Sequence, residues 1–155
     1  MTILVVDDNL ENLKVISTFL NERKYRIALA ADGKSALKIL ESNMIDLILL
    51  DIMMPETDGF EICRIVKANI ETKNIPVIFL TARIDIEDIM IGFNIGGADY
   101  ITKPFNKEEL YARVTSQVQL KLAKDCLFKC EMDLRKSKEY FMKTLYDLRK
   151  IFSHD

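Results

Sequence analysis

Short, continuous apolar runs alternate along the chain with segments in which apolar residues recur at the spacing of a helix. The apolar runs at residues 3–6 and 47–50 predict buried strands, and further strands are predicted at residues 26–30, 77–80 and 99–102. The segments between them predict helices at residues 10–20, 33–43, 60–68 and 85–94. This alternation predicts an α/β fold, namely a doubly wound five-stranded parallel sheet with helices on both faces and right-handed crossovers.

Polar residues and glycines predict where several of these helices begin and end. Asn9 is a good cap for the first helix, whose apolar positions at helical spacing are Leu10, Leu13, Ile16 and Leu20. The helix at residues 85–94 is predicted to stop at Gly96 and Gly97. Asn106 is a good cap for a last helix, which meets no glycine or proline before the end of the sequence.

Turn-forming residues and charge are distributed unevenly along the 155 residues. All five glycines and all three prolines lie between Gly33 and Pro104, and the residues that follow contain neither. Residues 1–105 carry 11 basic and 16 acidic side chains, whereas residues 106–155 carry 11 basic and 8 acidic ones. We therefore predict a globular domain at residues 1–120 and a helical extension at residues 121–155.

The last helix carries a large apolar residue at every seventh position. These residues are Leu120, Leu127, Leu134, Phe141 and Leu148. The companion positions three residues later are mostly small or polar, and they hold Ala123, Cys130, Ser137, Thr144 and Ile151. A seven-residue repeat is typical of a coiled-coil seam, and Asp133 and Lys138 have the spacing of an ion pair between parallel helices. We predict a parallel homodimer through this helix, with a helix folded back on its own domain as the alternative.

Charge and hydropathy exclude several classes of protein. The formal net charge of −2 disfavours a nucleic-acid binder, and the basic residues of the extension are dispersed among acidic ones. Because the apolar runs are far shorter than the roughly 20 residues that span a bilayer, we expect no membrane span, and we expect no signal peptide because the N-terminus has no basic leader. Cys63, Cys126 and Cys130 are then interpreted as reduced thiols in the cytoplasm that serve as small hydrophobic residues.

The residues that follow the predicted strands carry the candidate chemistry. The first strand is followed by Asp7 and Asp8, the third by Asp51, the fourth by Thr81 and the fifth by Lys103. Because ligands of open parallel sheets bind beyond the carboxyl ends of the strands, we expect these side chains to converge at one edge. Three carboxylates without histidine or cysteine suit a hard cation, and Mg²⁺ fits best. Such a site could receive a phosphoryl group, with one carboxylate as nucleophile and Lys103 offsetting the charge.

Each of these residues has an ordinary structural explanation when it is taken alone. Asp7 or Asp8 could cap a helix, Thr81 could simply end a strand, and Lys103 could be a surface charge. Independent caps and surface charges have no reason to gather at one edge of a sheet, so their joint occurrence favours a functional site.

Five short motifs, in order along the chain, resemble those of one known family. The motifs are Val5-Val6-Asp7-Asp8-Asn9, Leu49-Leu50-Asp51-Ile52-Met53-Met54-Pro55, Asp58-Gly59, Leu80-Thr81-Ala82 and Tyr100-Ile101-Thr102-Lys103-Pro104-Phe105. Over residues 1–120 the chain closely resembles the receiver domain of two-component response regulators, which has the fold of the chemotaxis regulators. The resemblance implies the strand order 2-1-3-4-5 and a cis peptide bond before Pro104.

The resemblance also implies roles for the residues at this edge. Asp51 would accept a phosphoryl group from the phosphohistidine of a sensor histidine kinase or a phosphotransfer protein. Asp8, Asp51 and the backbone carbonyl of Met53 would bind Mg²⁺, for which Mn²⁺ could substitute, and Asp7 would bind it directly or through water. Lys103 would contact the phosphoryl oxygens.

A conformational switch is the further implication of the resemblance. Thr81 would hydrogen-bond to the phosphoryl group, and Tyr100 would change rotamer into the space that Thr81 leaves. The face made by the fourth helix, the fifth strand and the fifth helix would then change, and the extension would carry the change toward an output domain. The protein would thus be a phosphoacceptor that catalyses its own phosphotransfer and dephosphorylation, and not an enzyme acting on a separate substrate.

Met53 and Arg83 match family positions that influence how fast the acyl phosphate hydrolyses. Because an apolar Met53 could hinder the attacking water, we predict a long-lived phosphoryl state.

Three alternatives stay open on the sequence alone. A phosphohydrolase with an aspartate nucleophile would need a second acid two residues later, where this chain has Met53. A dimerisation module that has lost its chemistry is opposed by the complete set of acids, threonine and lysine. The ending at residues 151–155 faintly resembles the start of a histidine-kinase phosphoacceptor motif around His154, so the chain could also be a fragment of a hybrid histidine kinase.

Overall fold

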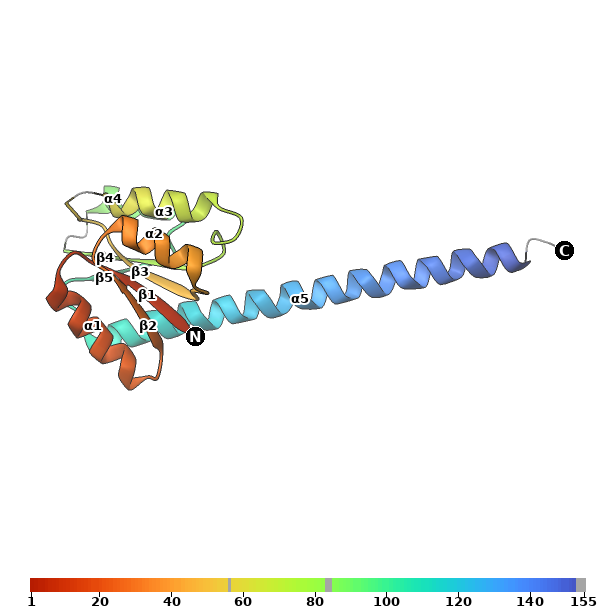
Figure 1. The fold of residues 1–155 in the computed structure, drawn as a ribbon, viewed down its shortest axis with the longest axis horizontal. Helices are drawn as coiled ribbons and strands as arrows, with labels where there is room; N and C mark the ends of the chain where they lie inside the picture. Colours follow the sequence, from red (N-terminus) through yellow and green to blue (C-terminus); the bar gives the residue numbers. More distant parts are fainter. Residues whose placement is uncertain (56, 83–84, 153–155) are drawn as a thin grey trace. The chain divides into compact units, whose positions relative to one another are not determined.

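The computed structural model of the protein describes residues 1–55, 57–82 and 85–152 (Figure 1). The chain divides into two compact units, Met1–Lys121 and Leu122–Asp155. The last helix, α5 (Lys107–Phe152), contributes residues to both units. Arg83 and His154, which the sequence singled out, lie outside the described residues.

Five parallel strands in the described part of the chain form one sheet in the order β2-β1-β3-β4-β5, which confirms the predicted order. The strands are β1 (Thr2–Val6), β2 (Arg26–Ala30), β3 (Leu47–Asp51), β4 (Val77–Thr81) and β5 (Asp99–Thr102). Nearly every side chain of β1, β3 and β4 is buried, because helices cover both faces of the sheet. Burial on both faces explains why these strands are continuous apolar runs in the sequence.

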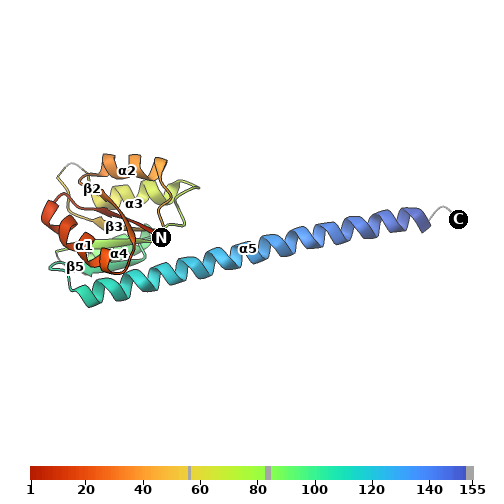
Figure 2. The same ribbon diagram turned by 60° about the horizontal axis from the view of Figure 1, so that its bottom comes forward.

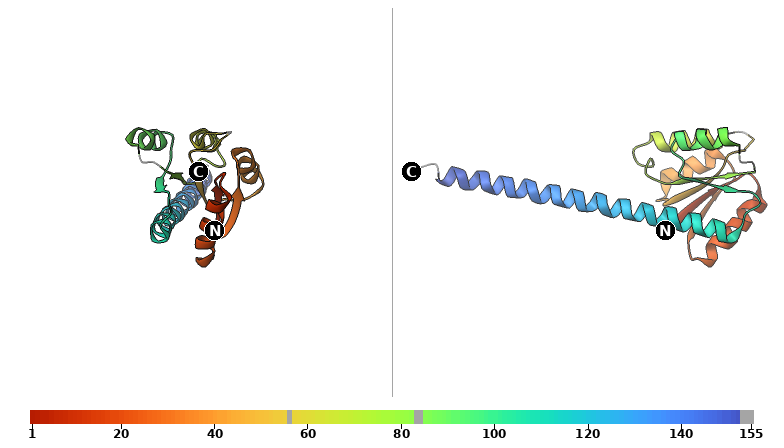
Figure 3. Two further views of the ribbon diagram at one scale, coloured as in Figure 1. Left: turned by 90° about the vertical axis from the view of Figure 1, so that its left-hand side faces the viewer. Right: turned by 180° about the vertical axis from the view of Figure 1, so that it is seen from behind.

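Helices cover the two faces of the sheet, as the left view of Figure 3 shows. One face is covered by α2 (Gly33–Ser42), α3 (Gly59–Ala68) and α4 (Ile86–Asn94), and the other by α1 (Leu10–Glu22) and the first turns of α5. α1 and the first turns of α5 lie side by side in Figures 1 and 2. The Tyr111 hydroxyl of α5 donates a hydrogen bond to the Phe19 carbonyl oxygen of α1 at 2.7 Å. The predicted doubly wound α/β architecture is confirmed.

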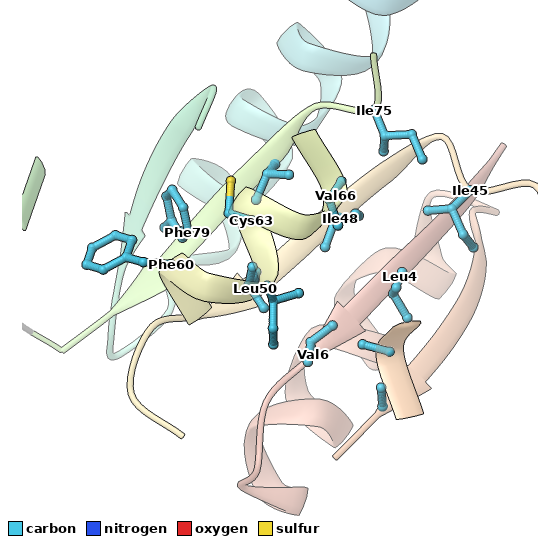
Figure 4. Close-up of a cluster of buried hydrophobic side chains, with 14 of the residues drawn as sticks. Leu4, Val6, Ile45, Ile48, Leu50, Phe60, Cys63, Val66, Ile75 and Phe79 are labelled. Atoms are coloured by element: carbon cyan, nitrogen blue, oxygen red, sulfur yellow. The ribbon is translucent and has the colours of Figure 1, made fainter. Parts of the chain in front are cut away.

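Clusters of buried apolar side chains hold these layers together, one on each face of the sheet. The cluster beneath α2 and α3 is drawn in Figure 4, where Leu50, Val66 and Phe79 lie between the strands and α3. On the other face, Ile16 of α1 and Leu110 of α5 pack against the sheet. Burial of an apolar side chain of this size stabilises the folded state by about 1.5–3 kcal/mol relative to exposure. The two clusters therefore hold the strands, and with them the strand ends, in place.

Two asparagines cap helices as predicted. The Asn9 side-chain oxygen accepts the backbone N–H of Glu11 at 2.8 Å, and the Asn106 side-chain oxygen accepts that of Glu109 at 2.9 Å. Leu10, in contrast, departs from the predicted apolar stripe of α1, because its side chain is 71% exposed. With about 100° of rotation per residue, Leu10 lies about 90° from the centre of the stripe that the three buried residues of α1 define.

The second unit is helical from residue 122 to residue 152, and the side chains of residues 122–151 are exposed. Cys63 is buried in the core, as the sequence predicted, whereas Cys126 and Cys130 are exposed. Within the single chain the interpretation of the last two as hydrophobic filling is therefore wrong, since one isolated helix offers them no packed layer. The coiled coil stays a prediction. Within the described residues, no helix combines the length and the apolar character that a membrane span requires.

Candidate functional site

The carboxyl ends of the strands bring the predicted residues to one edge of the sheet. Asp51 is the last residue of β3, and Thr81 is the last residue of β4. Asp7 and Lys103 each lie one residue beyond a strand, where the backbone pairing continues. The Asp7 N–H donates to the Ala30 carbonyl at 3.2 Å, and the Lys103 N–H donates to the Thr81 carbonyl at 2.8 Å. Strand pairing therefore fixes the backbone from which these side chains project.

Three carboxylates gather at this edge, where one oxygen from each of Asp7, Asp8 and Asp51 lies within 4.8 Å of the others. Asp7 is completely buried and Asp51 is 3% exposed, whereas Asp8 is exposed. The Asn12 side-chain amide donates to the two Asp7 oxygens at 3.1 and 3.0 Å, and the Asn9 N–H donates to Oδ1 at 2.9 Å. The start of α1 therefore fixes the orientation of the buried Asp7 carboxylate.

Lys103 supplies positive charge to the cluster. Its Nζ lies 2.8 Å from Asp7 Oδ2 and 2.9 Å from Asp51 Oδ2, so one ammonium group bridges two buried carboxylates. These two contacts offset the free-energy cost of removing the three charges from water. A single weak contact would not suffice, because burying a charge costs more hydration energy than such a contact returns. The peptide bond between Lys103 and Pro104 is cis, as predicted.

Burial and charge act in opposite directions on the pKa values of Asp51 and Lys103. Burial raises the pKa of Asp51 and outweighs the hydrogen bond and the charge of Lys103, which lower it. Burial alone would lower the pKa of Lys103, but hydrogen bonds and charges from Asp7 and Asp51 together raise it above its ordinary value. Lys103 therefore stays protonated at neutral pH and remains a cation beside Asp51.

The loop between β3 and α3 borders the open side of the site. The Met53 N–H donates to Asp51 Oδ1 at 3.3 Å, while the Met53 side chain is 77% exposed. The Gly59 N–H donates to the Ile52 carbonyl at 3.0 Å and closes the loop onto the strand end. A groove of about 780 Å³ lies beside the loop, and its lining includes Asp8, Met53, Met54, Asp58, Arg64 and Asp88. The groove leaves room for another molecule next to the carboxylates.

Tyr100 connects β5 with α4. In the sheet, Tyr100 of β5 pairs with Phe79 of β4, and the centroids of their rings are 5.3 Å apart. Two residues further along, Thr81 of β4 pairs with Thr102, the last residue of β5. The Tyr100 hydroxyl lies 3.0 Å from the carbonyl oxygens of Asp88 and Ile89 and donates to them. Burial, with the nearby charge of Asp88, raises the pKa of Tyr100 to about 12, so the hydroxyl keeps its proton.

The sequence model of the response regulator receiver domain matches residues 3–115 of this chain. The chain belongs to the response regulator receiver family. It is 46% identical over 126 residues to the protein of Vibrio cholerae named "Probable cyclic di-GMP phosphodiesterase", and this alignment covers 81% of the chain and 28% of the relative. It is 44% identical over 117 residues to the nisin biosynthesis regulatory protein NisR of Lactococcus lactis, covering 76% of the chain and 50% of that protein. The receiver chain therefore spans half or less of these curated relatives.

The solved structure of the chemotaxis response regulator CheY4 of Vibrio cholerae resembles this receiver domain with a TM-score of 0.71 and 30% sequence identity. The superposition covers 75% of this chain and 97% of CheY4. The likeness therefore extends over a whole receiver domain. It also confirms the fold of the chemotaxis regulators that the sequence motifs predicted.

Five residues that sequence reasoning placed at one edge of the receiver domain do lie at that edge, namely Asp7, Asp8, Asp51, Thr81 and Lys103. The same reasoning missed Asn12, which holds Asp7, and the close packing of Gly59, where a Cβ atom would overlap the carbonyl oxygen of Asp51. The position of Asn12 could have been recognised from the sequence, because Asn12 lies one helical turn after the cap Asn9 and therefore faces the same edge of the sheet. Gly59 belongs to the motif Asp58-Gly59, but its packing depends on contacts with other elements, which the sequence pattern does not reveal.

Proposed function

We propose that Asp51 of this receiver domain accepts a phosphoryl group from the phosphohistidine of a sensor histidine kinase or a phosphotransfer protein. A carboxylate oxygen of Asp51 attacks phosphorus, the bond between phosphorus and the imidazole nitrogen breaks, and the nitrogen keeps the electron pair and takes up a proton. The observation that carries the proposal is the pairing of Asp51 with Lys103 inside a cluster of three carboxylates at the end of β3.

Asp51 suits the role of nucleophile better than its acidic neighbours. Both oxygens of Asp7 are engaged by the Asn12 amide, which holds this carboxylate in place. Asp8 is exposed at the border of the cluster. Asp51 is buried and accepts a long hydrogen bond of 3.3 Å from Met53, so its Oδ1 is the least constrained oxygen of the two buried acids. Met53 also stands two residues after Asp51, where an aspartate-based phosphohydrolase would need a second acid.

The donor set of the cluster fits Mg²⁺. Three carboxylates supply oxygen ligands, which this cation prefers, and a divalent cation would relieve their mutual repulsion. Asp8 and Asp51 would hold the ion together with the backbone carbonyl of Met53, and Asp7 would bind it directly or through water. Mn²⁺ could take the same place. When bound, the ion would offset the charge of the phosphoryl oxygens.

Lys103, Thr81 and Tyr100 would respond to the phosphoryl group. The Lys103 ammonium, 2.9 Å from Asp51, would transfer its hydrogen bonds to the phosphoryl oxygens. Thr81 ends the strand next to β3, and its hydroxyl would bond to the same group. Tyr100 would then change rotamer, which would alter the face formed by α4, β5 and α5 by favouring one of two existing conformations.

The intact mass of the full chain tests the proposal directly. After incubation with Mg²⁺ and acetyl phosphate as a small phosphodonor, the mass should increase by one phosphoryl group. An unchanged mass after prolonged incubation would contradict the proposal.

Met53→Asn is expected to shorten the lifetime of the phosphorylated chain severalfold. Met53 is exposed beside Asp51, and an apolar side chain there offers no hydrogen bond to an attacking water, whereas an asparagine amide does. The decay of the phosphorylated mass measures the rate. Met44→Asn is the matched control, because Met44 is 92% exposed and lies in the loop between α2 and β3. Equal decay rates in the Met53 variant and the wild type would contradict the proposed effect of Met53 on hydrolysis.

We infer that α5 beyond residue 120 is a signalling helix, which pairs with a second copy of the chain in a parallel coiled coil and leads toward an output domain. The seam residues Leu127, Leu134 and Phe141 are between 62% and 72% exposed, so this stripe is free to pack. A long helix gains little stability without packing, which supports a partner helix. The aligned relatives are longer than the shared receiver, which supports an output domain.

We also infer that the protein lies in the cytoplasm. Its three cysteines are free thiols, which are typical of proteins in a reducing compartment.

Oxidation of the full chain is expected to link two copies through Cys130. In a parallel coiled coil in register, Cys130 lies at the seam opposite the same residue of the second copy, whereas Cys126 lies at the flank. Non-reducing electrophoresis after mild oxidation should show a covalent dimer. Cys130→Ser should remove it, and the control Cys126→Ser should keep it. A dimer that instead depends on Cys126 would contradict this register.

Light scattering of the reduced chain provides the complementary measurement. Leu134→Lys places a charge in the seam and should halve the mass in solution, whereas Met142→Lys, on the outer side of the helix, should leave it unchanged. A wild-type chain that is monomeric at high concentration would contradict the proposed dimer.

A further inference from the structure

A slot beneath α4 holds the hydroxyl end of Tyr100. The hydroxyl donates to the carbonyl oxygens of Asp88 and Ile89, at 3.0 Å each, and reaches the backbone of Gly92 one turn further along α4. Gly92 is buried in the last turn of α4, two residues before the helix ends at Asn94, and glycine within a helix is less favourable than alanine. The absence of a side chain at position 92 therefore calls for a structural reason.

The packing of Tyr100 provides this reason. A Cβ atom at position 92 would overlap the Tyr100 hydroxyl oxygen and would lie 2.8 Å from the ring carbon that carries it. The same Cβ would lie 3.0 Å from Cε2 of Phe79, which also packs against Tyr100. An alanine at position 92 and the observed position of Tyr100 therefore exclude each other.

Tyr100 belongs to a row of aromatic rings that crosses this face of the sheet. The ring centroids are 5.2 Å apart between Phe60 and Phe79, 5.3 Å between Phe79 and Tyr100, and 5.3 Å between Tyr100 and Phe93. Figure 4 shows Phe60 and Phe79 next to each other. Phe60 is the second residue of α3, directly after the loop beside Asp51, and Phe93 is half-exposed on α4. The row thus connects the loop at the carboxylate cluster with the exposed side of α4.

We propose that Gly92 is the positioning residue of the Tyr100 switch. The missing side chain at position 92 opens the slot, and Tyr100 in the slot ties β5 to α4 through its hydroxyl and through its contact with Phe93. When Tyr100 leaves the slot, these ties are lost and α4 is free to shift. Gly92 thereby determines which Tyr100 position is stable before phosphorylation. The meaning of the slot for signalling rests on the switch role proposed for Tyr100, but the slot itself is independent of phosphorylation.

A double-substitution cycle on the full, unphosphorylated chain tests the slot. Gly92→Ala should lower the urea midpoint of unfolding, because the new methyl group expels Tyr100. In a Tyr100→Ala background the same substitution should leave the midpoint unchanged or raise it, because alanine favours the helix and Phe79 can relax into the vacated space. An equal decrease in both backgrounds would overturn the proposal, because the cost would then not arise from Tyr100.

The NMR signal of Tyr100 supplies a readout that general destabilisation would not move. In a chain with ¹³C-labelled tyrosine rings, the Tyr100 signal is the one that Tyr100→Phe removes. Gly92→Ala should shift this signal toward the position of exposed tyrosines. The control Met90→Ala, on the exposed side of α4, should leave it in place. An unshifted Tyr100 signal in the folded Gly92 variant would overturn the proposal.

These measurements separate the slot from the proposed phosphotransfer. Both use the unphosphorylated chain, so a wild type that takes up no phosphoryl group would contradict the function of Asp51 and leave the result for Gly92 intact. Conversely, normal phosphoryl uptake with an unshifted Tyr100 signal would overturn the role of Gly92 alone.

Discussion

Asp51→Asn is expected to abolish the uptake of a phosphoryl group from acetyl phosphate. The amide of asparagine is neutral and a poor nucleophile, and it removes one of the two carboxylates that Lys103 bridges at 2.8 and 2.9 Å. The intact mass of the wild type should increase by one phosphoryl group, whereas the mass of the variant should not change. Removal of divalent cations from the wild type with EDTA should likewise prevent the increase, because the three carboxylates would repel the incoming dianion.

Asp32→Asn is the matched control for this experiment. Asp32 is the cap of α2, where its Oδ1 accepts the Ser35 N–H at 2.7 Å, and asparagine caps a helix as well as aspartate does. The control should therefore take up the phosphoryl group at the rate of the wild type. A phosphoryl group that still appears on the Asp51 variant would place the acceptor at another residue and contradict the proposed chemistry.

Gly59→Ala is expected to lower the free energy of unfolding by about 3 kcal/mol, the upper part of the usual range for overpacking. A Cβ atom at this position would overlap the carbonyl oxygen of Asp51 and lie 2.8 Å from Cα of Ile52. Both atoms belong to the backbone at the end of β3, which strand pairing holds in place, so the clash cannot be relieved by a side-chain rotation. Urea denaturation followed by circular dichroism measures the change.

Gly33→Ala is the matched control, because Gly33 also begins a helix of the same face. There the new Cβ would lie 2.6 Å from Cδ1 of Ile62, which is the end of a flexible side chain, and 3.1 Å from a methyl carbon of Thr57. This substitution should cost less than about 1 kcal/mol, since a rotation of Ile62 relieves the contact and the loss of glycine entropy in the unfolded chain offsets part of the cost. Equal losses at the two positions would contradict the backbone clash at Gly59.

Much of the fold could be predicted because it depends on patterns that lie close together in the sequence. Runs such as residues 47–50 and 77–80 are apolar on both sides, and a strand covered by helices on both faces requires this. Asn9 and Asn106 signalled helix starts, because a cap acts over two or three residues. The exposure of Leu10 was not predicted, since its spacing fits a helix but its direction from the buried stripe decides its burial.

The candidate site could be predicted for a related reason. Parallel strands point their carboxyl ends to the same edge, so residues far apart in sequence, such as Asp7, Asp51 and Lys103, converge once the strands are known. The contacts of Asn12 and the slot at Gly92 were not predicted. Each depends on atoms from another element approaching within a few ångströms, and the sequence pattern carries no information about such distances.

By itself, the sequence determined the order of strands and helices along the chain, the edge of the sheet at which the carboxylates and the lysine gather, and the seven-residue repeat of the extension. These features follow from periodicity, chain direction and residue chemistry, which are local properties. Only the tertiary structure decided which oxygens Lys103 bridges, how Asn12 orients Asp7, and why Gly59 and Gly92 have no room for a side chain. The physical reason is that close packing is set by atoms of several elements at once, so a clash or a hydrogen bond exists only when all of them are in place.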